Sequence, residues 1–208
     1  MSSKHMTRYI PIRNPSKLSH HQRAILLRKV PGSAKLSTSM RKAVRVLSRS
    51  GIPSLVVGGY AVQEIGYARF TSDIDIVVPD IEEARTRLLG HGFNEIPGPN
   101  MAVIDPMTTV RVNLMPGGGA MGPGPIPLPM PVAVTSEPSI AALQTLLGMK
   151  LSSYFGSPVS RLKDLADVVE LIKANKTPRE FNLNSEVVHE YQRVWDGLQE
   201  ERLGSDFF

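Results

Sequence analysis

The feature that most restricts how this sequence can fold is a 16-residue segment, residues 116–131, that contains five Gly and six Pro. Such a segment cannot hold a helix and is poorly suited to a central strand, because Pro lacks an N–H and Gly weakens regular structure. Short alternating apolar runs precede it, and apolar stripes of helical period follow it. We expect a flexible loop here; the functional alternative is a mobile flap or a partner-docking segment.

Composition excludes several classes of protein. A chain of 208 residues with 41% hydrophobic content can bury a core and makes one or two domains. The absence of Cys excludes disulfide scaffolds, thiolate zinc sites, iron–sulfur clusters and cysteine nucleophiles. No apolar run approaches the roughly 20 residues of a membrane span, and the N-terminus lacks the apolar stretch of a signal peptide. We therefore expect a cytoplasmic protein without membrane contact.

The net charge of +5 is unevenly distributed along the chain. Residues 1–50 carry 12 Lys and Arg and no acidic residue, whereas residues 51–208 carry a net charge of −7. We expect a flexible basic arm over residues 1–36 and a helix over residues 37–50, capped by Ser37 or Ser39. A basic segment of this kind suits RNA phosphates or an acidic protein partner; the alternative is a solvated basic helix face.

The remaining patterns predict an α/β (α+β) part over residues 37–135 and a helical part over residues 136–208. The expected elements of the first part are strands at 53–57, 72–78, 93–96, 101–104 and 110–115, with helices at 60–67 and 81–89. In the second part we expect helices beginning at Ser136, at Ser160 and at Asn184 or Ser185.

Two acidic residues stand out on the second expected strand. Asp73 and Asp75 alternate with isoleucines, so their carboxylates share one face about 6–7 Å apart. Two anions this close repel unless a cation lies between them, and Mg²⁺ is commonly held by one or two carboxylates together with substrate phosphates. The alternative is an ordinary exposed strand face.

A glycine pair lies between the first strand and the following helix. Gly58 and Gly59 would let the backbone approach a ligand, and the start of a helix favours phosphate. Many strand-to-helix turns need glycine for their conformation alone, so the pair by itself decides nothing.

Taken together, Leu55-Val-Val-Gly58-Gly59-Tyr-Ala-Val and Arg69-Phe-Thr71-Ser-Asp73-Ile-Asp75-Ile resemble the nucleotidyltransferase superfamily that includes DNA polymerase beta. The second segment looks most like the small bacterial members related to abortive-infection and toxin–antitoxin systems, and the aminoglycoside- and lincosamide-modifying nucleotidyltransferases share a similar core. The resemblance implies a small mixed β-sheet flanked by helices. It also implies Mg²⁺-dependent transfer of a nucleoside monophosphate from an NTP to a hydroxyl of RNA, protein or a small molecule.

The resemblance also implies a role for each matching residue. Gly58 and Gly59 would hold the triphosphate, and Asp73 and Asp75 would hold one or two metal ions. Arg69 and Thr71 would support the acidic strand or contact phosphate. If the likeness to toxins extends to function, an antitoxin partner is implied.

A looser likeness continues through Met149-Lys150-Leu151 and Arg161-Leu-Lys163-Asp164-Leu-Ala-Asp167, so that it spans roughly residues 50–175. In this likeness Lys150 contacts a phosphate and Asp164 is a further catalytic candidate. Helical spacing places Lys150 on an apolar helix face, where it must snorkel, pair with Asp164 or meet an anion. Asp164 and Asp167 could equally form ion pairs between helices.

The sequence departs from the superfamily at Asn113. Members usually carry a third carboxylate there, which helps to hold the metal and to deprotonate the attacking hydroxyl. An amide oxygen can ligate a metal, but it brings no charge and is no base. Asp105, in a turn, is a weak replacement.

Three interpretations of this departure stay open. The enzyme works with two carboxylates and another base such as Asp164, or it is slowed, or the fold binds a nucleotide or partner without catalysis. A different alternative is an RNA-binding protein that acts through its basic arm. The resemblance requires Asp73, Asp75 and Asn113 to converge beside Gly58 and Gly59.

Overall fold

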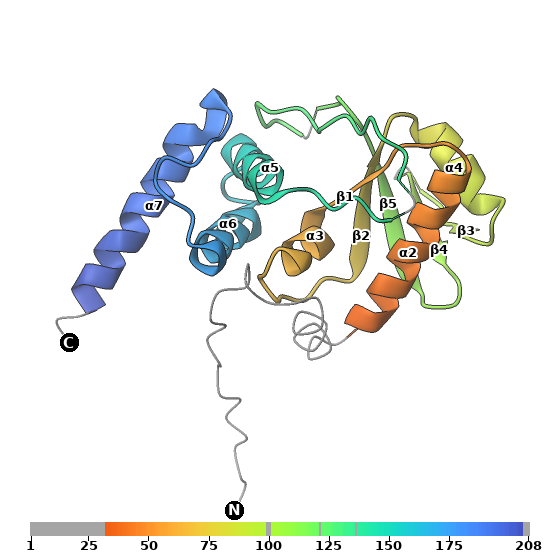
Figure 1. The fold of residues 1–208 in the computed structure, drawn as a ribbon, viewed down its shortest axis with the longest axis horizontal. Helices are drawn as coiled ribbons and strands as arrows, with labels where there is room; N and C mark the ends of the chain where they lie inside the picture. Colours follow the sequence, from red (N-terminus) through yellow and green to blue (C-terminus); the bar gives the residue numbers. More distant parts are fainter. Residues whose placement is uncertain (1–31, 99–100, 121, 136, 206–208) are drawn as a thin grey trace, which may run out of the picture.

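The structure is a computed structural model that describes residues 32–98, 101–120, 122–135 and 137–205, with side chains as far as residue 201. Its centre is a five-stranded sheet of order β1-β2-β5-β4-β3. The strands are β1 (Leu55–Val57), β2 (Asp73–Val78), β3 (Asn94–Glu95), β4 (Ala102–Asp105) and β5 (Val110–Pro116). Strands β2 and β5 are parallel and the other pairs are antiparallel. The predicted α/β class with a small mixed sheet is confirmed (Figure 1).

Two apolar clusters hold helices against the sheet. The first joins α2 (Ser33–Arg49) and α4 (Ile81–Leu89) to one sheet face. The second joins the other face to α3 (Gly58–Glu64), α5 (Leu143–Gly156), α6 (Leu162–Asn175) and α7 (Ser185–Ser205). In the described part of the chain, no helix is long and apolar enough to cross a membrane.

The alternation along β2 decides where its acidic side chains lie. Ile74 and Ile76 are fully buried in the first cluster, and Val77 is buried in the second. Because successive side chains on a strand point to opposite faces, Asp73 and Asp75 share the face of Val77. The two carboxylates are therefore presented toward α5 and α6.

Helix α2 begins earlier than predicted, at Ser33 after Gly32, so the expected start at residue 37 and the cap by Ser37 or Ser39 are wrong. Leu36 is buried, and its apolar side chain extends the helix toward the N-terminus. Ser39 is also buried and donates to Asp105 Oδ2 at 2.9 Å instead of capping the helix. The rest of the expected basic arm, residues 1–31, lies outside the described residues.

The helix expected from Ser136 is wrong over residues 137–142, because α5 begins only at Leu143. This stretch instead runs beside β1. Val56 N donates to Ser139 O at 2.8 Å, and Ala141 N donates to Val56 O at 2.9 Å. An edge strand has unpaired backbone groups, and pairing them outweighs the local helix-start signals of the stretch.

The described residues of the Pro/Gly-rich segment after Pro116 form a loop, as predicted, and this loop folds back on itself. Gly118 N donates to Leu128 O at 2.9 Å, and Leu128 N donates to Gly119 O at 2.8 Å. Leu128 is buried, and Ile126 N donates to Ser152 Oγ of α5 at 2.9 Å. These contacts place the segment, which we call the Pro/Gly hairpin, against α5.

Candidate functional site

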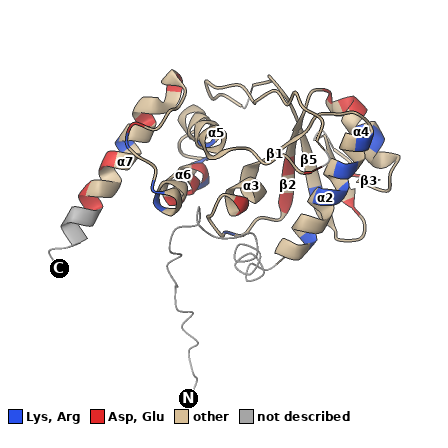
Figure 2. Ribbon diagram, in the orientation of Figure 1, with Lys and Arg blue, Asp and Glu red and all other residues tan. Residues whose placement is uncertain are grey.

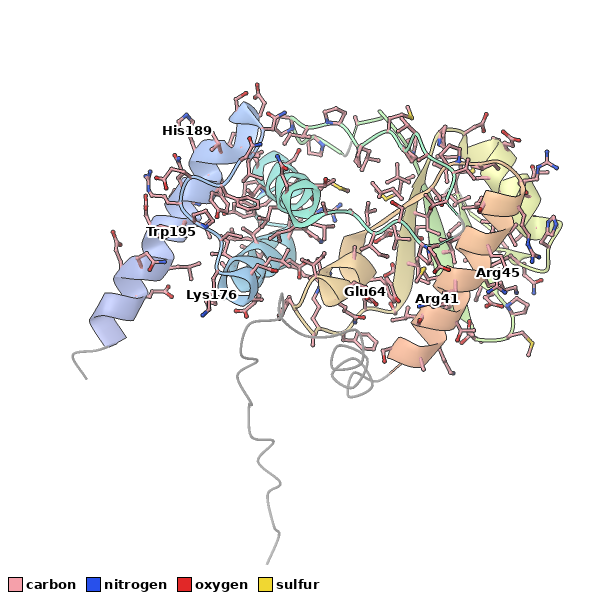
Figure 3. The ribbon with its side chains drawn as sticks, viewed as in Figure 1. Arg41, Arg45, Glu64, Lys176, His189 and Trp195 are labelled. Atoms are coloured by element: carbon pink, nitrogen blue, oxygen red, sulfur yellow. The ribbon has the colours of Figure 1, made fainter. Side chains whose placement is uncertain are left out.

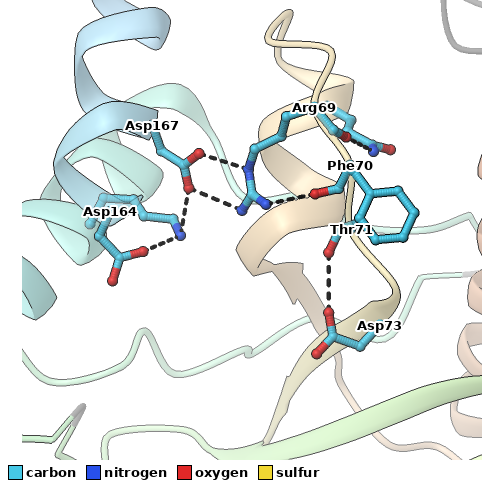
Figure 4. Close-up of polar contacts among 8 residues, drawn as sticks. Arg69, Phe70, Thr71, Asp73, Asp164 and Asp167 are labelled. Atoms are coloured by element: carbon cyan, nitrogen blue, oxygen red, sulfur yellow. Dashed lines mark hydrogen bonds and ion pairs between the residues drawn. The ribbon is translucent and has the colours of Figure 1, made fainter. Parts of the chain in front are cut away.

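The parallel pairing of β2 with β5 brings the acidic strand beside Asn113. The register sets Asp75 opposite Asn113. Asn113 Nδ2 donates to Asp73 Oδ2 at 3.1 Å and to Asp75 Oδ1 at 2.8 Å. Thr71 Oγ1 donates to Asp73 Oδ1 at 3.1 Å (Figure 4). Asp73, Asp75 and Asn113 therefore converge, as the resemblance requires.

The amide of Asn113 has a defined orientation. Arg111 Nε donates to Asn113 Oδ1 at 2.7 Å. A guanidinium can only donate and a carboxylate can only accept, so the amide oxygen faces Arg111 and the NH₂ group faces the carboxylates. A role for Asn113 as a metal ligand through its oxygen stays a prediction, and it requires the amide to turn over.

The glycine pair leaves no room for side chains against the acidic strand. Gly58 has a φ of +65°, and a Cβ there would lie 1.9 Å from Asp75 Oδ2. A Cβ on Gly59 would lie 2.6 Å from Thr71 Oγ1. The turn therefore needs glycine for close approach to the side chains of the same site as well as for conformation.

The other predicted site residues, Arg69, Lys150 and Asp164, form a largely buried cluster of four charges together with Asp167 (Figure 4). Lys150 Nζ lies 2.6 Å from Asp164 Oδ1 and 2.9 Å from Asp167 Oδ2. Arg69 Nε lies 2.7 Å from Asp167 Oδ1. Two cations and two anions cancel, so the ion pairing between elements is what this structure contains. A phosphate contact of Lys150 or Arg69 stays a prediction.

Surroundings push the pKa values of two carboxyl groups in opposite directions. Burial raises the pKa of Asp75, and the hydrogen bond from Asn113 only partly opposes this. Burial also acts to raise the pKa of Asp164, but the charge and hydrogen bond of Lys150 and the hydroxyl of Ser153 outweigh it, so the pKa is lowered.

A cavity of about 440 Å³ opens beside the acidic strand, between the sheet, the Pro/Gly hairpin and helices α5 and α6. Its polar lining includes Gly58, Asp75, Lys150 and Asp164, so it connects the two groups of predicted residues. Its lining also includes Ser157, Ser160 and Arg161 from the turn between α5 and α6, to which the sequence patterns assigned no role. A turn has no periodicity to reveal them; the start of the Arg-x-Lys-Asp segment was the one available signal.

The donor set of the site fits a hard cation in part. Among the described residues, no group of three or more His, Cys, Asp or Glu is arranged to hold a metal ion. Asp73 and Asp75 do supply two carboxylates, and Mg²⁺ commonly takes one or two together with oxygens of its substrate. The acid pair fits such an ion, whereas Asn113 in its present orientation does not.

No family model and no curated protein matches the sequence. Among solved structures, the chain is similar to the antibiotic-resistance factor ANT(2'')-Ia, whose solution structure was described as revealing substrate-regulated conformation dynamics. The match has 12% identity and a TM-score of 0.43, and it covers 82% of this chain and 98% of the other. At these values the likeness carries no functional argument, so the case for function depends on the site itself.

Proposed function

We propose that this chain is a Mg²⁺-dependent nucleotidyltransferase that moves a nucleoside monophosphate from an NTP to a hydroxyl group. The observation that carries the proposal is the convergence of Asp73, Asp75 and Asn113 beside Gly58, at the wall of a cavity. Asp73 and Asp75 form no ion pair with any described residue. The charges of Lys150 and Arg69 act on Asp75 without forming an ion pair with it. A half-buried pair of carboxylates without a directly paired protein cation is a place where a bound cation is favourable.

In this proposal Asp73 and Asp75 hold the metal ion, which when bound stabilises negative charge on the phosphoryl oxygens. The chain itself supplies the positioning. Thr71 holds one carboxylate by its hydroxyl, and the Asn113 amide keeps the two carboxylates at a fixed spacing. Gly58 and Gly59 allow the triphosphate to approach the strand.

The proposed reaction needs a base that deprotonates the acceptor hydroxyl. Asp164 is our sequence-based candidate, but its lowered pKa makes it a weak base. Its contacts with Lys150 and Ser153 support a role in holding the Lys150 ammonium at the cavity wall. Arg69, bound to Asp167, would in the same way support the segment that leads into β2.

A second candidate function is nucleotide or partner binding without catalysis. The orientation of Asn113 favours it, because an amide NH₂ between the two carboxylates occupies hydrogen-bonding positions that a cation would otherwise use. In that case the acid pair would be held by the protein alone, and the cavity would serve for recognition.

We propose that the acceptor and any protein partner bind at the outer surface of the protein. The side chains of Arg41, Arg45 and Arg49 on helix α2 are exposed. Figure 3 labels Arg41 and Arg45, and Figure 2 shows the basic residues of α2 in blue. With the rest of residues 1–50 they would bind RNA phosphates or an acidic partner, and a toxin-type enzyme in the cytoplasm would also meet an antitoxin. Phosphate binding of this kind weakens steeply with salt.

Labelled NTPs test the proposal directly. The protein is incubated with each labelled NTP, Mg²⁺ and total RNA or lysate, and label transfer is followed. We expect transfer by the wild type and its loss in Asp73→Ala. Tight NTP binding without label transfer, even after Asn113→Asp, would support the hypothesis of binding without catalysis and contradict the proposed transferase activity. Salt-sensitive RNA binding that disappears without residues 1–50 would support the role of the basic segment.

A further inference from the structure

We propose that Arg161, in the turn between α5 and α6, is the side chain that contacts the phosphate tail of a nucleotide in the cavity. The inference rests on the proposed function, because it assigns the anion-binding group of the same cavity. It transfers to Arg161 a role that sequence patterns give to Lys150.

The charges along the cavity support this assignment. The ammonium of Lys150 already lies within 2.6 Å of Asp164 Oδ1 and 2.9 Å of Asp167 Oδ2, and its side chain is 12% exposed. An ammonium balanced by two carboxylates offers a further anion little net attraction. Arg161 lines the same cavity, is exposed, and forms no ion pair with the described residues. The charge of Arg161 also acts on Asp164 and helps to lower the pKa of that carboxyl. Among the described residues no carboxylate lies within ion-pair distance of the guanidinium, so its N–H donors are available to a ligand.

The turn holds Arg161 at the cavity wall through its own backbone. Arg161 N donates to Ser157 O at 3.1 Å, and Asp164 N donates to Arg161 O at 2.9 Å. Ser157 and Ser160 line the cavity beside it and offer hydroxyl groups. A guanidinium presents a planar fork of donors that matches two phosphate oxygens, which an ammonium does not.

The rest of the cavity suits the remainder of a nucleotide. Leu128 of the Pro/Gly hairpin and Leu146 and Met149 of α5 give it an apolar wall. Its volume of about 440 Å³ lies within the usual range of small-molecule sites. A ligand with an anionic tail and a flat apolar end would use both kinds of lining, with Arg161 at the tail.

Calorimetric titration of the full chain in the presence of Mg²⁺ tests the assignment. The probes are ATP, inorganic triphosphate and adenosine. The variants are Arg161→Gln, Arg161→Lys and, as a matched control, Lys163→Gln, which removes one exposed cation from the first turn of α6 without touching the cavity lining. Arg161 is exposed, so these variants should fold normally, which circular dichroism checks.

We expect Arg161→Gln to weaken the binding of ATP and of inorganic triphosphate by about tenfold, because a charged hydrogen bond is lost. Arg161→Lys should recover part of the loss, and adenosine binding and the Lys163→Gln variant should match the wild type. Equal triphosphate affinity in Arg161→Gln and the wild type, or equal losses in Arg161→Gln and Lys163→Gln, would overturn the inference alone. Triphosphate binding that depends on Arg161, without any label transfer, would support the assignment of Arg161 and contradict the proposed transferase activity. A wild type that binds neither ATP nor triphosphate would overturn both.

Discussion

Two pairs of carboxylates each contribute one residue, Asp75 or Asp164, to the lining of the same cavity, and the surroundings of the two pairs differ. Asp164 and Asp167 on α6 are paired with Lys150 and Arg69, at N–O distances of 2.6 to 2.9 Å. Among the described residues, the side-chain donors to Asp73 and Asp75 on β2 are neutral, namely Thr71 and Asn113. The charges of the first pair are balanced by cations of the protein itself, and these ion pairs join α6 to α5 and to the segment before β2. The second pair is electrostatically incomplete, which is the condition expected of a ligand site.

The comparison teaches that an Asp-x-Asp or Asp-x-x-Asp spacing does not by itself separate structure from function. Both spacings put two carboxylates on one face of their element. What separates them is the set of cations that other elements bring within reach, and this is a property of the tertiary structure.

The largest expected effect is on activity, from Asp75→Asn. Replacing this half-buried carboxylate with an isosteric amide removes a charge that the proposed metal ion needs, and we expect transfer to fall by roughly a thousandfold, since such ions contribute several kcal/mol to catalysis. Burial raises the pKa of Asp75, so ionised Asp75 is disfavoured in the folded state and its loss should leave stability unchanged or increased.

Label transfer and urea denaturation of the same preparation measure the two quantities. Strong destabilisation of Asp75→Asn, comparable with that expected of the other acid pair, would remove the distinction between the pairs.

The next effect is on stability, from Asp167→Asn. This change leaves Arg69 and Lys150 buried with one carboxylate between them, and breaking a buried ion pair costs about 3 kcal/mol. The matched control is Glu170→Gln on the same helix, whose partner Lys173 has a side chain 51% exposed. The control should cost less than about 1 kcal/mol, because surface pairs contribute little.

Urea denaturation compares the two variants of α6. Equal, small losses from Asp167→Asn and Glu170→Gln would mean that the buried cluster contributes no more than a surface pair, and the interpretation of the cluster as a structural link would fail.

A third buried carboxylate, away from the cavity, extends the comparison to pH. Asp105 accepts from Lys42 Nζ at 2.9 Å and from Ser39 Oγ at 2.9 Å, and it links α2 to the end of β4. Burial acts to raise the pKa of Asp105, but these donors outweigh it and lower the pKa below its ordinary value of 3.8. The stabilisation should therefore be complete above about pH 5 and decline as the pH falls below 3.8.

Asp105→Asn should reduce the free energy of unfolding by about 2 kcal/mol at pH 6, because the Lys42 ammonium and the Ser39 hydroxyl lose a charged acceptor. Urea denaturation at pH 6, 4 and 3 should show the gap between variant and wild type closing toward low pH. A gap that stays constant over this range would contradict the assignment, and label transfer at neutral pH should be the same in both proteins.

Sequence patterns correctly predict the elements whose structure depends only on nearby residues in the chain. Helix α4 spans Ile81–Leu89 as expected, and Asp80 caps it by accepting from Glu83 N at 2.9 Å. The alternation on β2 correctly placed Asp73 and Asp75 on one face, because strand periodicity depends only on the chain itself. The convergence of the acid pair with Asn113 was expected from the resemblance, and the register of β2 and β5 produces it.

Sequence patterns do not predict the features that depend on contacts with residues far away in the chain. Residues 137–142 carry helix-start residues, yet they pair with Val56, some 80 residues earlier in the chain. The ion pairs of Lys150 with Asp164 and Asp167 were one of several open alternatives, because choosing among them requires the packing of α5 on α6. The role of Arg111 in turning the Asn113 amide had no sequence signal at all.

The smallest and most diagnostic change is Asn113→Asp, which tests what the neutral amide does for the acid pair. The change replaces an NH₂ donor by a third carboxylate, and Arg111 can still donate to it. Without metal, three neighbouring carboxylates repel, so stability should fall by about 1 kcal/mol. With Mn²⁺ as the probe, the added anionic ligand should tighten binding by about tenfold, measured by electron paramagnetic resonance of free Mn²⁺. Asn94→Asp, on the exposed strand β3, adds the same charge away from the site and should change neither quantity. If Asn113→Asp binds Mn²⁺ no more tightly than Asn94→Asp, position 113 does not face the cation, and the difference between the two acid pairs has a cause other than a metal site.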